Sequence, residues 1–136
     1  MKLKLLYKGQ IYQIAATYDG DACPIDDFLN SNDPAIQGYL DGMANIIEHV
    51  ANNGFQNSPS DWFHEASKQK QIYEFIKGPF RVFFFKGVAE TIAVCVCYVR
   101  KSGNKADKAS VNYASEKRKE YENAIEANSV ELIEED

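Results

Sequence analysis

The stretch GPFRVFFFKGVAETIAVCVCYVRKSGNK, residues 78–105, holds two apolar runs separated by a turn at Gly87. With QIYEFIKG, residues 71–78, these runs are typical of β-strands, because they are rich in β-branched and aromatic residues and are separated by glycine. The runs VFFF and IAVCVC are apolar on both faces, which indicates central strands covered on both sides. We therefore expect an antiparallel meander. Its last strand ends in three cations, Arg100, Lys101 and Lys105.

The first half of the chain indicates a hairpin followed by helices. Residues 2–8 and 11–18 alternate in polarity and are joined by a short turn, which predicts two paired strands. A short helical turn should follow. Asp33 then offers an N-cap with Pro34 at the first helical position, and apolar residues recur at three- and four-residue steps until about Gly54. This pattern predicts an amphipathic helix that lies on the sheet.

The last part of the chain predicts a helix and an acidic tail. Asp107 is available as a capping residue, and the residues after it place apolar side chains at near-helical spacing. The final segment ELIEED is more typical of a frayed end than of a packed one. We therefore expect an α+β fold, with residues 1–125 as a single domain that includes an N-terminal hairpin extension over 1–20, and an acidic tail over 126–136.

Composition limits the class of protein. The chain has 136 residues, 45% of them hydrophobic and 26% charged, as in a globular domain with one core. No apolar run approaches the roughly 20 residues that span a bilayer. The N-terminal stretch alternates in polarity, unlike a signal-peptide core. We expect a cytoplasmic protein with no membrane partner.

The cysteines favour neither a disulfide nor a metal site. Cys95 and Cys97 lie two apart in an apolar strand, so we expect them on the same face, where they cannot easily bridge each other. Cys23, His49 and His64 complete the soft ligands, with no CxxC or HxxxH spacing. The sequence therefore predicts buried free thiols, no metal and no cofactor.

Charge is segregated along the chain. The formal net charge is −5, yet residues 66–119 carry twelve basic and four acidic side chains. A basic block of this kind provides salt-dependent contacts to phosphates, although ordinary solvated lysines are the alternative. The acidic residues lie before and after this block.

Four pieces of this block occur in an order known from one toxin family. They are IYEFIKG at 72–78, FRVFFFK at 80–86, YVRKSGNK at 98–105 and ASEKRKEY at 114–121. Over roughly residues 25–125 the chain resembles the RelE/HigB toxin superfamily, and in particular its phage-derived branch. The resemblance implies helices packed on a twisted antiparallel sheet with a C-terminal helix. It also implies a toxin that cuts messenger RNA, usually on the ribosome and without a metal, and that is restrained by an antitoxin protein, for which a short helix-turn-helix protein is one candidate.

The chemistry of RNA cleavage points to four candidate catalytic residues. Attack of a ribose 2′-hydroxyl on phosphorus adds negative charge, and arginine is the side chain best suited to bind it. Arg81 matches the arginine of the family motif, with a structural ion pair to Glu74 as the alternative. Lys101 is a second candidate cation. For proton transfer the resemblance points to Tyr113, or to His64 before the meander; a core tyrosine and a surface histidine are the alternatives.

Five further residues are candidates for RNA binding. Lys68 and Lys70 lie near His64 in the sequence and compete with it for the same role, while Tyr98 could stack on a base. Arg100 should point to the face opposite Lys101 if the strand persists, so one of the two would face RNA. Lys105 matches the trailing lysine of the motif, or is a solvated loop lysine.

Two departures from the family pattern keep a second hypothesis open. The chain carries the N-terminal hairpin and a net negative charge, which ribosomal RNA would repel. A non-catalytic RelE-like module that binds a protein or nucleic-acid partner through its basic face is therefore the alternative, since a fold does not fix a function. The acidic tail could also fold over the basic face and mask it.

Overall fold

The computed structural model describes residues 1–101 and 107–134, and within them the chain forms one mixed β-sheet in the order β3-β4-β5-β6-β2-β1-β7. The strands are β1 (Lys2–Lys8), β2 (Gln13–Thr17), β3 (Phe63–Ser67), β4 (Ile72–Lys77), β5 (Phe80–Lys86), β6 (Ile92–Arg100) and β7 (Glu131–Ile133). The α-helices are α1 (Pro24–Leu29), α2 (Gln37–Asn53) and α3 (Lys108–Glu126), and two short 3-10 turns are η1 (Ser60–Trp62) and η2 (Val88–Glu90). The α+β class is therefore confirmed.

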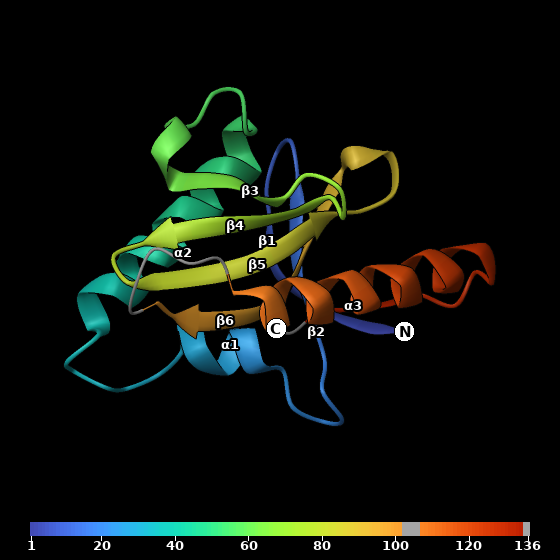
Figure 1. Cartoon of the computed structure of the whole chain (residues 1–136), viewed down its shortest axis with the longest axis horizontal. Coiled ribbons are helices and arrows are strands. Elements are labelled where there is room, and N and C mark those ends of the chain that lie inside the picture. Colours follow the sequence, from blue (N-terminus) through green and yellow to red (C-terminus); the bar gives the residue numbers. More distant parts are fainter. Residues whose placement is uncertain (102–106, 135–136) are drawn as a thin grey trace.

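Helices cover both faces of the sheet. Figure 1 shows α3 in front of the sheet and α2 behind it. On the α1/α2 side the core contains Leu40, Met43 and Val50 of α2 against Phe75 and Phe84 of the sheet. On the α3 side it has a separate core that includes residues of β1, β2, β4, β5 and β6. Both faces of the central strands are buried, as their continuous apolar runs predict.

The predicted meander is confirmed, but the expectation of a wholly antiparallel sheet is wrong. β4, β5 and β6 pair antiparallel in sequence order. β2, however, runs parallel to β6, and β7 runs parallel to β1. Parallel pairing is possible here because long connections separate these strands in the sequence.

The N-terminal hairpin is confirmed as a hairpin, but it is not an appendage. β1 and β2 pair antiparallel, and β2 lies directly against β6 in the middle of the sheet. Leu3, Ile14 and Ala15 have no exposed surface. The hairpin is thus part of the same fold unit as the meander, and it makes the sheet larger than the family resemblance implies.

The predicted start of the long helix is wrong, and its end is confirmed. The Asp33 carboxylate accepts a hydrogen bond from the Ala35 amide (3.0 Å), which makes a local turn, and α2 begins only at Gln37. The helix ends at Gly54, whose φ of +83° is a conformation that favours glycine. At the start of α3, the Asp107 carboxylate accepts a hydrogen bond from the Ser110 amide (3.0 Å), as the sequence predicts.

The expectation of a frayed acidic tail is wrong for the described residues up to Glu134. Glu131–Ile133 forms β7 against β1, and Val130 and Leu132 pack against the core on the α3 side. Both side chains are partly buried, so this acidic segment has an apolar contact with the rest of the fold. β7 occupies the edge of the sheet opposite β3, so this strand does not cover the β3 to β6 region that holds the basic block. Among the described residues, no helix is long and apolar enough to cross a membrane.

A β-bulge in β6 overturns the prediction that Cys95 and Cys97 share a face. Phe83 pairs with Cys97 and Phe84 pairs with Cys95, so β6 has one extra residue, Val96, at this point. Cys95 therefore belongs to the core on the α1/α2 side, and Cys97 packs on the α3 side. The bulge also determines which faces the later residues of β6 take.

Candidate functional site

A buried carboxylate lies on the α3 side of the sheet. Glu74 in β4 is only 5% exposed, and it pairs with His64 of β3 and Phe83 of β5. Thr17 and Glu74 are the buried polar residues in the described part of the chain. A buried charge is costly unless a partner compensates it. The partners of Glu74 are His64 and Arg81, and we call these three residues the Glu74 cluster.

His64 lies at the solvent side of the cluster. Its Nδ1 is 3.1 Å from Oε1 of Glu74, and its side chain is 58% exposed. When Nδ1 carries the proton and donates it to the carboxylate, the other ring nitrogen, Nε2, has a free lone pair. Within the described residues Nε2 has no partner, so His64 could exchange a proton with a bound molecule.

Arg81 lies on the other side of the carboxylate and is largely buried. Its Nε is 3.8 Å from Oε1 of Glu74, and its side chain is 17% exposed. Its Nη1 donates to the main-chain oxygens of Gly78 (2.8 Å) and Phe80 (2.9 Å). The ion pair with Glu74, the alternative considered from the sequence, is therefore present. The contacts leave Nη2 without a partner among the described residues, so the guanidinium retains one group for an anion.

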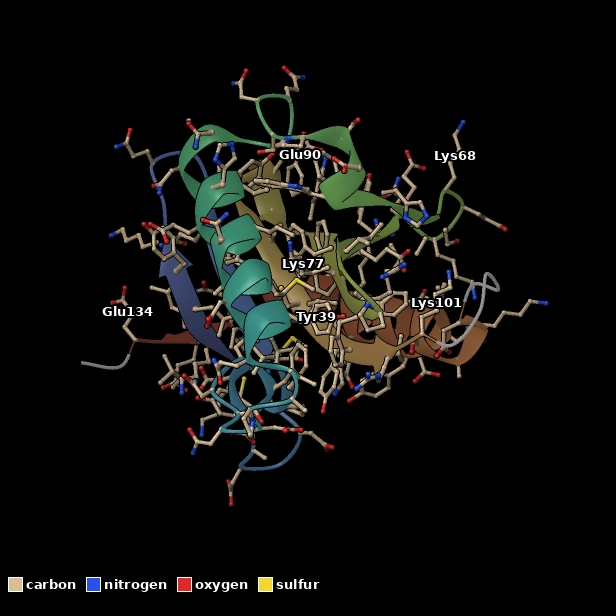
Figure 2. The ribbon with its side chains drawn as sticks, turned by 90° about the vertical axis from the view of Figure 1, so that its left-hand side faces the viewer. Tyr39, Lys68, Lys77, Glu90, Lys101 and Glu134 are labelled. Carbon is tan, nitrogen blue, oxygen red and sulfur yellow. The ribbon has the colours of Figure 1, made fainter. Side chains whose placement is uncertain are left out.

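Lys101 lies on the same side of the sheet as Arg81. Val99 pairs with Arg81, and the Lys101 amide donates to the oxygen of Pro79 (2.7 Å), which extends the β6 ladder by one residue. Because side chains alternate along a strand, Lys101 shares a face with Val99. Figure 2 shows Lys101 beside α3, whereas Tyr39 and Lys77 lie beside α2.

The two lysines between β3 and β4 have different environments. Lys70 donates through Nζ to the side chain of Asn112 in α3, and its main-chain oxygen accepts from Arg118 (3.0 Å). Lys70 therefore connects the β3–β4 turn to α3. Lys68 is exposed and points away from the fold (Figure 2).

Three further candidates, Tyr98, Arg100 and Tyr113, are not part of the Glu74 cluster. Tyr98 stacks on Phe28 of α1, and Arg100 lies over the ring of Phe80, so both side chains are on the α1/α2 side. Tyr113 in α3 is exposed, and Nζ of Lys117 lies 5.6 Å from its ring centre. Lys105 lies outside the described residues.

The sequence candidates are thus divided between two faces of the sheet. His64, Arg81 and Lys101 share the α3 side, and Tyr98 and Arg100 share the other. Glu74 was considered only as a structural partner of Arg81, although one signal was available: it is the one acidic residue in the strand IYEFIK. Its contact with His64 could not be anticipated, because no local pattern around His64 indicates a strand.

Neither thiol of β6 is suited to nucleophilic chemistry at neutral pH. Burial raises the pKa of Cys97 to about 11, and complete burial raises the pKa of Cys95 still further. A thiol with so high a pKa is protonated at pH 7, and the thiolate is the reactive form. In the described part of the chain, no group of three or more His, Cys, Asp or Glu side chains is arranged to hold a metal ion.

Comparison of the sequence with protein-family models and with curated proteins finds no match.

Proposed function

We propose that the chain is an RNA-cleaving toxin whose reaction takes place at the Glu74 cluster. The observation that carries this proposal is that one buried carboxylate holds a histidine and an arginine together at the sheet surface. The four sequence pieces that resemble the RelE/HigB superfamily support it, since three of them correspond to β4, β5 and the end of β6 and the fourth lies in α3.

The reaction fits the groups of the cluster. Nε2 of His64 accepts the proton of a ribose 2′-hydroxyl, and the 2′-oxygen then bonds to the adjacent phosphorus. Arg81 stabilises the negative charge that gathers on the phosphoryl oxygens, and Lys101 adds a second cation. The bond from phosphorus to the 5′-oxygen breaks, and a proton returned by imidazolium or water neutralises that oxygen. The products are a 2′,3′-cyclic phosphate and a 5′-hydroxyl, and no metal takes part.

Partners follow from this assignment. The substrate is messenger RNA, with the ribosome as the place of cleavage, and the protein acts in the cytoplasm. A cognate antitoxin, with a helix-turn-helix protein as one form, restrains it. Contacts to RNA phosphates come from the basic side chains of residues 66–119, so we expect binding to fall as salt is raised, although the net charge of −5 weakens it overall.

One observation favours a second candidate function, a non-catalytic binding module. Arg81 is mostly buried and is already engaged by Glu74, Gly78 and Phe80. A guanidinium with three protein contacts can act as a structural element instead of a phosphate ligand. In that case the basic face binds a nucleic acid or a protein without cutting it.

The experiment that separates the two candidates is the mapping of new RNA 5′ ends in a translating extract after the purified protein is added. Active protein should generate new ends that carry a 5′-hydroxyl. His64→Gln and Arg81→Lys should each reduce cleavage by about 10²-fold or more, because each removes one role in the transition state.

Two control variants change similar side chains that lie outside the Glu74 cluster. His49→Gln alters the other histidine, which bonds to the Asn57 oxygen and packs on Trp62, and it should leave cleavage unchanged. Lys119→Ala removes one exposed cation from α3 and should do the same. Intact RNA with folded wild-type protein would reject the nuclease, and RNA binding in that sample would support the second candidate.

A further inference from the structure

A pocket opens on the α1/α2 side of the sheet, at the end where β6 stops. Its volume is about 510 Å³, which lies in the range of small-molecule sites. The lining residues are Pro24, Asp27, Phe28, Ser31, Asp33, Ile36, Phe80, Tyr98 and Arg100. None of them belongs to the Glu74 cluster.

Aromatic rings form the walls of this pocket. Tyr98 stacks on Phe28, with ring centres 4.0 Å apart and an interplanar angle of 15°. Phe28 also packs against Phe80 at 5.1 Å. Tyr98 remains 40% exposed, so part of this platform is open to a ligand. An exposed aromatic surface of this kind is suited to stack on a planar ring.

The charged groups of the pocket have both signs. The Arg100 guanidinium lies 5.4 Å from the ring centre of Phe80. Asp27 and Asp33 contribute carboxylates, and Asp33 uses one oxygen to bond the Ala35 amide. Asp27 has no ion pair among the described residues. A ligand that fills the pocket should therefore present donors to a carboxylate and acceptors to a guanidinium.

Guanine fits this pattern best, because one of its edges offers arginine two acceptors. Its O6 and N7 are acceptors that arginine binds with two hydrogen bonds, and its N2 amino group is a donor suited to a carboxylate. Adenine lacks the O6 acceptor and the N2 donor, so it matches the charges less well. Single-stranded RNA commonly exposes its bases to such stacking and edge contacts.

We propose that this pocket binds an unpaired guanine of the RNA substrate. Arg81 and Phe80 are consecutive residues and point to opposite faces of the sheet. One RNA strand that passes over this end of β5 and β6 could therefore place a phosphate at the Glu74 cluster and a neighbouring base in the pocket. This inference rests on the proposed RNA function, yet it concerns binding alone and can be tested without any cleavage.

The test measures the binding of 5′-GMP, 5′-AMP and inorganic phosphate to the whole chain by NMR titration. GMP should shift the ring signals of Tyr98 and Phe28 and should bind at least about fivefold more tightly than AMP. Inorganic phosphate should not shift these rings. Three results would each overturn the proposal: equal affinity for GMP and AMP, shifts confined to the Glu74 cluster, or no binding at roughly 10 mM nucleotide. This concentration corresponds to the weakest affinity that the titration is designed to detect.

Variants assign the contacts. Tyr98→Ala should weaken GMP binding by about tenfold, whereas Tyr98→Phe should retain it because the stacking ring remains. Asp27→Asn should reduce the preference for GMP over AMP. The matched control is Asp41→Asn on α2, because among the described residues the Asp41 carboxylate bonds only Gln37. Equal effects of the two Asp→Asn changes would also reject the proposal. Comparing unfolding curves of the Tyr98 variants excludes a loss of fold.

Discussion

Away from the pocket at the end of β6, the two sides of the sheet differ in how completely they are sealed. On the α1/α2 side, Phe75 and Phe84 stack with ring centres 4.1 Å apart, and Phe55 lies parallel to Phe84 at 5.6 Å. α2 covers them with six buried residues. On the α3 side, Phe83 and Phe85 are equally buried, but the same surface also contains the carboxylate of Glu74.

The difference originates in the position of α3. Figure 1 shows that α3 extends from the middle of the sheet toward one side, so the other end of β4, β5 and β6 continues past its first turn. The Glu74 cluster lies toward that end, where Arg81 is the second residue of β5. A buried charge persists only where its partners remain in place, so the difference indicates that the aromatic core under α2 contributes stability, whereas the Glu74 cluster is suited to chemistry.

The largest effect on stability is expected on the sealed side. Phe84→Ala should lower the free energy of unfolding by about 3–5 kcal/mol, since it leaves a cavity among Phe75, Phe55 and Tyr73. Urea unfolding followed by circular dichroism measures it. Ile125→Ala, at a partly exposed position of α3, is the control and should change stability by less than about 1 kcal/mol. Similar losses for both variants would contradict the comparison.

The second effect is expected on activity, on the open side. Glu74→Gln keeps the shape of the side chain but removes the charge that holds Arg81 and His64. Cleavage should fall by about tenfold or more, while the free energy of unfolding changes by less than about 2 kcal/mol. The kinetic assay and the unfolding curve are measured on the same protein.

A second Glu74 variant separates positioning from structure. Glu74→Leu removes the carboxylate and leaves the largely buried Arg81 without its ion-pair partner, so it should lower the free energy of unfolding. If the carboxylate served only the fold, the folded fraction of this variant would retain RNA cleavage. ¹⁵N NMR of His64 gives a readout that does not need activity. Loss of the Glu74 contact should decrease the population of the Nδ1–H tautomer, and an unchanged population would reject the positioning role.

Much of the fold could be predicted from residues that act locally. The strands of the meander follow from period-two apolar runs, and Gly54 and Asp107 end and begin helices through their own conformation and hydrogen bonding. Three features could not be predicted: the β2–β6 parallel pair, the strand β7 and the bulge at Val96. Each depends on segments that are distant in the sequence, or on one extra residue in a uniformly apolar run.

The site was predicted less well for the same reason. Arg81 and His64 were selected for their chemistry, but their common partner Glu74 brings them together through register across β3, β4 and β5. The expectation that Arg100 and Lys101 point to opposite faces agrees with the structure, but the sequence does not say which of them lies beside Arg81, and Tyr98 lies with Arg100 on the α1/α2 side. A one-residue shift in register reverses the face of every residue that follows, and no local pattern in IAVCVCYVR indicates the shift.

A smaller effect is expected from the loss of β7, the short strand that completes the α3 side. Deletion of residues 130–136 removes the half-buried Val130 and Leu132 and should lower the free energy of unfolding by about 1–2 kcal/mol. RNA affinity should not rise, because β7 lies at the edge opposite β3. Tighter RNA binding by the truncated chain would instead support an acidic tail that masks the basic face.

The smallest effect is expected from the thiol of Cys97, which lies on the α3 side of β6. Burial raises the pKa of Cys97 from 9.0 to about 11, so between these values the unfolded chain releases a proton that the folded chain retains. The folded state then binds more protons, and raising the pH from 8 to 10 must lower the free energy of unfolding, by about 1 kcal/mol from this group. Cys97→Ala should reduce this fall when unfolding is compared at pH 8 and pH 10. Burial also raises the pKa of Tyr12 and Tyr73, so some pH dependence should remain in the variant. If the free energy of unfolding falls equally in the variant and in the wild type, Cys97 is not held in the protonated form. The α3 side is then more open at β6 than the contact of the Cys97 thiol with the Ser110 oxygen indicates.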